Sequence, residues 1–269
     1  LKTGAHIGAP LHKNTMINLE LPKKITAFAA QAQQVGAGVF RPISRKYDKA
    51  EHAYPKELDL LRQLLDGVSA GGSDLAKGAS GLSGDGVERN TGVKNGSNMM
   101  SVVSIEEMCW GDVGLLLTIP GQGLGNAALA AVANEEQKQR FAGRWAAMAI
   151  TEPGAGSDSA NIRATAVLDG DEWVINGEKI FVTAGERADL VVVWAYLDKK
   201  LGRAAMKSFV VEKGTPGMTV TRLEHKLGIK ASDTAAISFT NCRVPKNNIL
   251  GSAEVDVSKG FGGVMKNFD

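Results

Sequence analysis

The sequence predicts an α+β protein in which an all-α N-terminal domain precedes an all-β domain. Before residue 146, apolar residues recur at spacings of three and four, which is the period of one face of a helix. After residue 146, β-branched runs such as 190–194 and 208–211 dominate, which is typical of strands. The chain has 269 residues, of which 43% are hydrophobic, so it is long enough to bury the cores of two domains.

Apolar spacing and capping signals locate the helices of the first part. Pro55 is a good first residue for a helix, and Asn134 is a good N-cap for the segment that follows it. The stretch from 71 to 96 is rich in Gly, Ser and Asp, and we expect a loop or lid there. Helices are expected over residues 21–35, 55–65, 98–117, 125–133 and 135–141.

Two dipeptides that favour tight turns divide the start of the β-rich part. Asp169-Gly170 and Asn176-Gly177 separate three short apolar runs, at 162–168, 172–175 and 179–183. Asp-Gly and Asn-Gly are the residues that two-residue hairpin turns prefer. The sequence therefore predicts a three-strand meander.

Residues 148–158, Met-Ala-Ile-Thr-Glu-Pro-Gly-Ala-Gly-Ser-Asp, change abruptly from apolar to small and polar. Pro153, Gly154 and Gly156 favour a turn in which backbone N–H groups converge on a phosphate or on the edge of a flavin. Downstream, the period of two in a strand places Phe181 and Thr183 on one face, where a flat ring could stack and accept a hydrogen bond. From spacing alone, an ordinary turn and a half-buried strand remain open as alternatives.

Composition argues against several other classes of protein. The formal net charge is +2 and no long basic run occurs, so we expect no nucleic-acid partner. Cys109 and Cys242 lack the spacing of a zinc site and are expected to be buried thiols in a reducing compartment. The glycines of 121–125 lack the context of a dinucleotide-binding fingerprint. No apolar run is long enough for a membrane span and no signal peptide is evident, so we expect a cytoplasmic protein.

Four segments, taken in order, carry a family resemblance. They are AMAITEPGAGSD at 147–158, VINGEKIFVTAG at 174–185, HKLGIKASDTAAISFTNCRVPKNNILG at 225–251 and KGFGGVMKNFD at 259–269. Their order and spacing closely resemble the acyl-CoA dehydrogenase family, over residues 19–269. The resemblance implies an N-terminal extension (1–18), an all-α domain (19–145), a middle domain that is a β-barrel or sandwich (146–256), and the start of a truncated C-terminal four-helix bundle (257–269).

The family oxidises acyl-CoA thioesters to trans-2-enoyl-CoA with FAD. A glutamate takes the α-proton, and the β-hydrogen leaves as hydride to the flavin N5. By resemblance the glutamate lies beyond Asp269, so no catalytic residue is expected in this chain. By resemblance the FAD-binding residues are Met148, Ile150, Thr151, Gly156, Ser157, Phe181, Val182 and Thr183, and the acyl-CoA contacts are Ser157, Arg203 and Asp269.

The resemblance also implies partners and leaves alternatives. It implies an acyl-CoA substrate in lipid metabolism such as fatty acid β-oxidation, electron-transfer flavoprotein as electron acceptor, and a homotetramer or heterotetramer. A non-catalytic, flavin-supporting subunit of a heteromeric enzyme and an oxidase or oxygenase relative remain open, as does a solvated surface charge for Arg203. Two residues depart from the family pattern: Phe181 stands where many members have Trp, and Met148 where many have Tyr or Phe.

Overall fold

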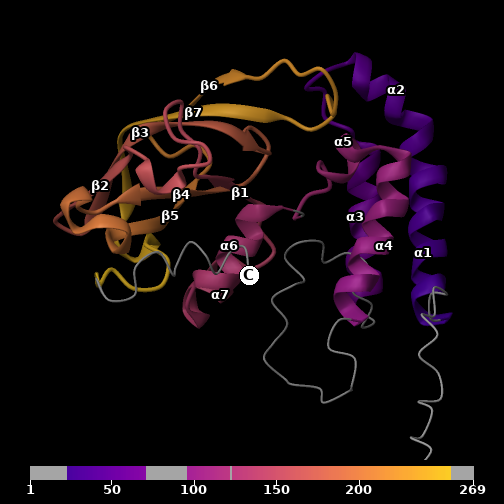
Figure 1. Cartoon of the computed structure of the whole chain (residues 1–269), viewed down its shortest axis with the longest axis horizontal. Coiled ribbons are helices and arrows are strands. Elements are labelled where there is room, and N and C mark those ends of the chain that lie inside the picture. The colour runs from indigo at the N-terminus through magenta and orange to yellow at the C-terminus, as the bar shows by residue number, and fades with distance from the viewer. Residues whose placement is uncertain (1–22, 71–95, 122, 256–269) are drawn as a thin grey trace, which may run out of the picture.

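The computed structural model describes residues 23–70, 96–121 and 123–255 and consists of a helical part beside a curled β-sheet (Figure 1). The expected fold class is confirmed: helices precede a β-rich domain along the chain. The N-terminal extension, the expected loop at 71–96 except its last residue, and the last segment from 256 onward lie outside the described residues. None of the described helices has the length and apolarity needed to span a membrane.

The helical part is built on a close crossing of two helices. α1 (Lys23–Val35) continues through a π-helical segment (Gly36–Phe40) into α2 (Arg41–Lys49), and α3 is Glu57–Ala70. α4 (Gly96–Gly111) lies against α1. A Cβ built on Gly111 would lie 2.4 Å from the backbone oxygen of Gly36, so the two backbones approach too closely for a side chain at this position.

The helix expected over 98–117 is broken in two. α4 ends at Gly111, and α5 (Val113–Leu116) starts after Asp112. The Asp112 carboxylate accepts a hydrogen bond from the N–H of Leu115 at 2.9 Å and another from the Ser44 hydroxyl of α2. Asp112 is therefore an N-cap, and the new helix starts because its side chain satisfies a free backbone donor.

α6 (Leu124–Val132) and α7 (Glu135–Arg140) pack on the sheet rather than on the helical part (Figure 1). Asn134 caps α7 as predicted, and Gln137 returns the bond to the Asn134 backbone, which completes a capping box. Ala128, Leu129 and Phe141 share one apolar cluster with β-strand residues. The domain boundary at 145/146 stays a prediction, and these two helices contribute to the core of the β part.

The sheet has seven strands in the order β1-β4-β2-β3-β7-β6, with β5 paired to β4. The strands are β1 (Ala146–Ala149), β2 (Thr165–Asp169), β3 (Glu172–Thr183), β4 (Leu190–Tyr196), β5 (Met206–Glu212), β6 (Met218–Leu223) and β7 (Thr234–Pro245). Short 3₁₀ segments lie at Ser159–Asn161, Lys199–Ala205 and Lys246–Asn248. β1 and β4 are parallel, whereas β3 and β7 form a long antiparallel pair.

The predicted three-strand meander is wrong in one respect: β3 runs unbroken through Asn176-Gly177. Asp169-Gly170 does form the β2–β3 hairpin, with Gly170 at φ +63. Gly177 instead lies at φ +151, where a Cβ would be only 2.6 Å from the Ala164 Cβ. This glycine is needed for a close approach between two backbones at an irregularity in the β3–β7 register.

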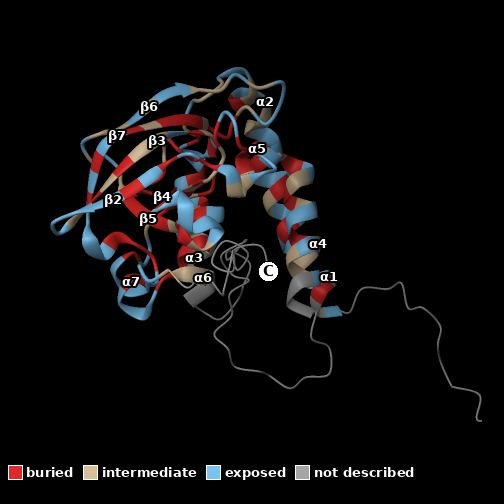
Figure 2. Ribbon diagram, turned by 60° about the vertical axis from the view of Figure 1, so that its left-hand side comes forward, coloured by how far each residue is buried: buried red, intermediate tan, exposed pale blue. Residues whose placement is uncertain are grey.

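β4 is buried along its whole length, and its two faces serve different cores (Figure 2). Val191, Val193 and Ala195 face the largest cluster, which also holds residues of β3, β5 and β7. Leu190 and Val192 pack against α6 and α7, and Trp194 and Tyr196 pack beneath residues 148–155. Because successive side chains of β4 point to opposite faces, this strand connects the largest cluster to the residues that support the predicted flavin loop.

One arginine joins the helical part to the β part. The Arg187 guanidinium donates at 3.0 Å to the carbonyls of His52 and Ala53 and at 2.9 Å to that of Ala231. It also pairs with the buried Asp233 carboxylate at 3.4 Å. Its side chain is only 8% exposed, and burial lowers the pKa of Arg187 from its ordinary value. We call this set of contacts the Arg187 seam.

Candidate functional site

The polar turn that follows β1 is closed by its own backbone. Glu152 and Ala155 exchange two hydrogen bonds, of 3.0 and 3.1 Å, across Pro153 and Gly154. The N–H of Ile180 in β3 donates to the Thr151 carbonyl at 2.9 Å. The predicted flavin loop, residues 150–158, is thus anchored to the strand that carries Phe181 and Thr183.

A buried ion pair fixes this loop from below. The Lys179 ammonium lies 2.8 Å from the Glu152 carboxylate, and the two side chains are 0% and 7% exposed. Lys179 also donates to the Ile150 carbonyl at 3.0 Å, while Glu152 accepts from the N–H groups of Arg163 and Ala164 at 2.6 and 3.0 Å. Burial lowers the pKa of Lys179 to about 8, although its bond to Glu152 opposes the shift.

Phe181 and Thr183 are exposed on the same side of β3, as the period of two predicts. The backbone reaches this arrangement through a bulge, because the register with β7 slips between Lys179 and Val182. Phe181 has φ +58, an uncommon value for a side chain other than glycine, and is 60% exposed. An apolar ring is thereby held on the surface by a strained backbone.

The remaining loop residues divide by burial. Met148 and Ile150 are half-buried against the cluster that includes Trp194 and Tyr196. Gly156 and Ser157 are exposed, and a Cβ on Gly156 would meet no atom within 4 Å. Val182 is buried in the core, so only its backbone could contact a ligand.

Of the two predicted acyl-CoA contacts outside the loop, the structure describes only Arg203. Arg203 is exposed in the 3₁₀ segment Lys199–Ala205, which the Lys199 ammonium connects to Asn161 at 3.3 Å. Both Arg203 and Asp158 act electrostatically on Tyr196, whose pKa is raised chiefly by burial. Arg203 therefore lies on the same side of the β part as the end of the loop. Asp269 lies outside the described residues.

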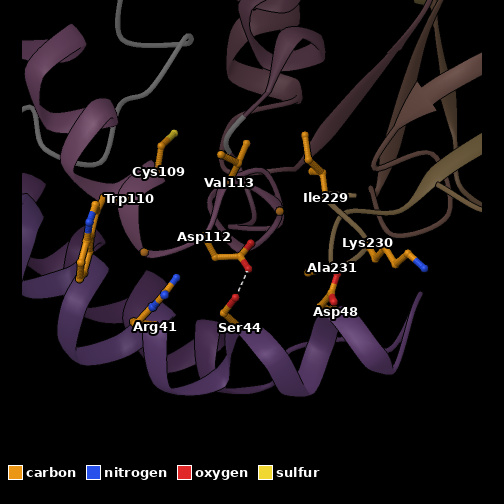
Figure 3. Close-up of a pocket in the computed structure, with 12 residues that line it drawn as sticks. Arg41, Ser44, Asp48, Cys109, Trp110, Asp112, Val113, Ile229, Lys230 and Ala231 are labelled. Atoms are coloured by element: carbon orange, nitrogen blue, oxygen red, sulfur yellow. Dashed lines mark hydrogen bonds between the residues drawn. The ribbon is translucent and has the colours of Figure 1, made fainter. Parts of the chain in front are cut away.

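A shallow pocket lies at the junction of the helical part and the β part rather than at the flavin loop (Figure 3). It contains none of the predicted cofactor or substrate residues. Figure 3 shows Ser44 and Asp112 hydrogen-bonded across its floor, with Arg41 beside Trp110. This pocket is therefore separate from the candidate flavin site.

Sequence reasoning missed Glu152 and Lys179 as residues that build the site. They are 27 positions apart, and neither stands in a pattern that predicts burial. In a regular strand Lys179 would share a face with Phe181 and Thr183, but the bulge between Lys179 and Val182 separates them, so Lys179 is buried and Phe181 and Thr183 are exposed. A buried lysine needs a buried anion. The loop supplies that anion.

Comparisons with known proteins agree with this geometry. Residues 147–242 match the model of the acyl-CoA dehydrogenase middle domain. The chain is 32% identical over 253 residues to the acryloyl-CoA reductase (NADH) of Anaerotignum propionicum, covering 88% of this chain and 57% of the relative. It is 34% identical over 200 residues to the short-chain-specific acyl-CoA dehydrogenase of Clostridium acetobutylicum, covering 71% of this chain and 52% of the relative.

Among solved structures, the butyryl-CoA dehydrogenase of Megasphaera elsdenii superimposes with a TM-score of 0.73 at 27% identity, over 93% of this chain and 63% of that one. A helical part followed by a curled seven-stranded sheet is the fold of an acyl-CoA dehydrogenase. The chain spans less than two thirds of the length of each of these proteins. It belongs to the acyl-CoA dehydrogenase family.

Proposed function

We propose that this chain is part of an FAD-dependent oxidoreductase that acts on an acyl-CoA thioester. The observation that carries the proposal is a surface formed by Thr151, Phe181 and Thr183 on backbone that the Glu152–Lys179 pair holds in place. We call it the Phe181 surface. Family membership supports the same reaction class.

The Phe181 surface fits a flavin in its donor set. Among the described residues, the hydroxyls of Thr151 and Thr183 make no side-chain hydrogen bond, so both are free to bond the polar edge of a ring. Phe181 offers an exposed apolar face, against which a flat heterocycle stacks favourably. The open space beside Gly156 lets a ligand approach the loop backbone closely.

FAD, when bound, would supply the hydride acceptor. The described residues would bind and orient it: Thr183 and Thr151 by hydrogen bonds, and Phe181 and Met148 by apolar contact that also excludes water. A dry, fixed site matters because the α-proton of a thioester becomes removable only when the carbonyl is polarised and the base is desolvated. By resemblance, that base comes from the part of the protein beyond Asp269.

For the substrate, Ser157 and Arg203 are proposed contacts of the acyl-CoA. Ser157 is exposed at the end of the loop, and its hydroxyl makes no hydrogen bond to a described residue. Arg203 would place a cation where the anionic CoA moiety could bind. The relatives are named for short acyl groups (acryloyl, short-chain, butyryl) and for a cyclic one (cyclohex-1-ene-1-carbonyl), so both kinds of acyl-CoA are candidate substrates.

The proposed electron acceptor is an electron-transfer flavoprotein, and the proposed assembly is a homotetramer or heterotetramer. The first relative is named a reductase, and reduction of an enoyl-CoA is the reverse of the proposed oxidation. The assay should therefore follow both directions. If the chain is instead a flavin-supporting subunit, it would bind FAD without turnover.

The direct test is to purify the full-length protein that contains this chain with FAD, record its visible spectrum, and measure dye reduction with butyryl-CoA and longer acyl-CoAs. We expect a yellow protein whose flavin content at limiting FAD falls about fivefold in Phe181→Ala and in Thr183→Val. Stacking of about 1 kcal/mol or more and one hydrogen bond of about 1 kcal/mol are lost in these variants.

Matched controls are Val167→Ala and Thr219→Val, which change an exposed apolar residue of β2 and an exposed threonine of β6. Both should keep full flavin content. Equal flavin loss in the controls, or full flavin in Phe181→Ala, would refute the assignment. Bound flavin with no turnover in either direction would support the non-catalytic subunit instead.

A further inference from the structure

Three potential metal ligands meet on the side of the molecule where the helical part joins the β part. Glu51 and His52 lie in the connection between α2 and α3, and His225 lies between β6 and β7. One ligand atom from each residue lies within 4.8 Å of the others. We call these residues the Glu51 cluster, and it contains none of the residues proposed to bind FAD or acyl-CoA.

The contacts within the cluster are already short. His225 Nδ1 lies 2.9 Å from a Glu51 carboxylate oxygen, and the other oxygen accepts the N–H of Lys226 at 3.0 Å. The rings of His52 and His225 are 5.3 Å apart between centroids and tilted by 57°. Ligands of a tetrahedral zinc ion are about 3.3 Å apart, since each lies about 2.0 Å from the metal. A bound zinc ion would therefore require the side chains to rotate so that the three atoms move closer together.

His52 has no other use for its ring nitrogens. Both nitrogens are buried, and neither makes a hydrogen bond. A neutral imidazole carries one donor and one acceptor, and burying them without partners costs roughly 1–3 kcal/mol. Native proteins satisfy such groups with protein atoms, ordered water or an ion. A metal ion beside His52 would satisfy the acceptor and explain why an imidazole is kept there.

We propose that Glu51, His52 and His225 bind one zinc-class divalent cation, with water as the fourth ligand. Two imidazoles and a carboxylate are a donor set that suits zinc. A glutamate carboxyl is anionic at neutral pH, so Glu51 supplies the negative charge of the donor set. Of the three cations nearby among the described residues, Arg187 pairs with Asp233, and the Lys226 ammonium donates to the Ser232 carbonyl at 2.6 Å. The third, Lys230, interacts electrostatically with Glu51 and would compete with a metal ion for it.

Such an ion would join the two parts of the chain beside the Arg187 seam. Arg187 donates to the backbone carbonyl of His52, and the metal ion would bind the side chain of the same residue. The ion would then stabilise the folded chain and, by linkage, would raise its melting temperature in proportion to the logarithm of the free zinc concentration.

The test uses the full chain, freed of metal with a chelator and titrated with Zn²⁺ by calorimetry. We expect one Zn²⁺ per chain. In His225→Gln and in His52→Gln the affinity should fall roughly a hundredfold or more, beyond the roughly 10–100-fold that loss of an outer-shell partner costs. The His225 side chain is 83% exposed, so its replacement leaves the packing intact, and circular dichroism should be unchanged. Bound Co²⁺ should show a visible spectrum that changes in the same variants.

The matched control is His6→Gln/His12→Gln, which removes the other two histidines of the sequence and leaves the cluster whole. This variant should bind zinc as the wild type does. Zinc binding that disappears in the control, or that is the same in wild type and His225→Gln, would overturn the proposal. No binding at millimolar zinc would also overturn it and would leave ordered water as the partner of His52.

Discussion

Removing the cation beneath the flavin loop should destabilise the whole chain. Lys179→Met keeps most of the side-chain volume, so it creates little cavity, but it leaves the Glu152 carboxylate 7% exposed without a cation. Two backbone N–H groups would still bind that carboxylate. Breaking a buried ion pair by removing one partner costs about 3–5 kcal/mol, because the remaining charge is uncompensated. We expect a loss of this size.

Urea denaturation followed by circular dichroism at pH 7 measures the loss. A decrease of about 4 kcal/mol corresponds to a melting temperature roughly 8–16 °C lower for a chain of this size. The matched control is Lys138→Met, because the Lys138–Glu135 pair has the same 2.8 Å separation but lies on the surface. An exposed pair contributes about 1 kcal/mol or less, so the control should be nearly neutral.

A double variant separates charge from packing. Glu152→Gln/Lys179→Met has no buried charge, so it should be more stable than Lys179→Met alone, although Gln cannot accept from both backbone N–H groups. If the double variant is as unstable as the single one, the loss comes from packing and the reasoning fails. Loss of stability equal to that of Lys138→Met would also refute it.

Three further results are expected. The pKa of Lys179 is lowered to about 8, so between about pH 8 and 10.5 the folded chain has released a proton that the unfolded chain retains. The free energy of unfolding of the wild type, measured by urea titration relative to Lys179→Met, should therefore rise with pH by somewhat under about 1.4 kcal/mol per pH unit. A difference that falls with pH would contradict this. Gly111→Ala should cost about 1–3 kcal/mol in the same assay, because its Cβ would meet the backbone of Gly36, whereas Gly38→Ala has open space and should be tolerated; equal effects would argue against the tight crossing. Arg187→Met should cost about 3–5 kcal/mol because its buried carboxylate partner loses its cation, and a near-neutral result in thermal melts would mean that the seam contributes little.

Much of the fold could be predicted from local patterns. Asn134 caps its helix because the capping residues and the apolar run after them are adjacent in sequence. The strand period predicted that Phe181 and Thr183 share a face, and both are exposed, although Phe181 lies within a bulge. The family resemblance named the flavin loop, and whether each of its residues binds FAD stays a prediction.

The features that could not be predicted depend on contacts between distant segments. Asn176-Gly177 has the composition of a hairpin turn, but its neighbour Ala164 and its partner strand β7 make extended backbone more stable there. Asp112 caps α5 locally, but its second hydrogen bond comes from Ser44, 68 positions away. The Glu152–Lys179 pair likewise joins two elements. No local propensity encodes such long-range partners.

The Arg187 seam has a consequence for the rates of folding. Its guanidinium binds His52, Ala53, Ala231 and Asp233, so the contacts can form only after segments up to 135 positions away have reached their places. Interactions that form after the transition state leave the folding rate nearly unchanged and slow unfolding. We therefore expect the contacts of the seam to form late in folding and to lengthen the lifetime of the folded chain by slowing its unfolding.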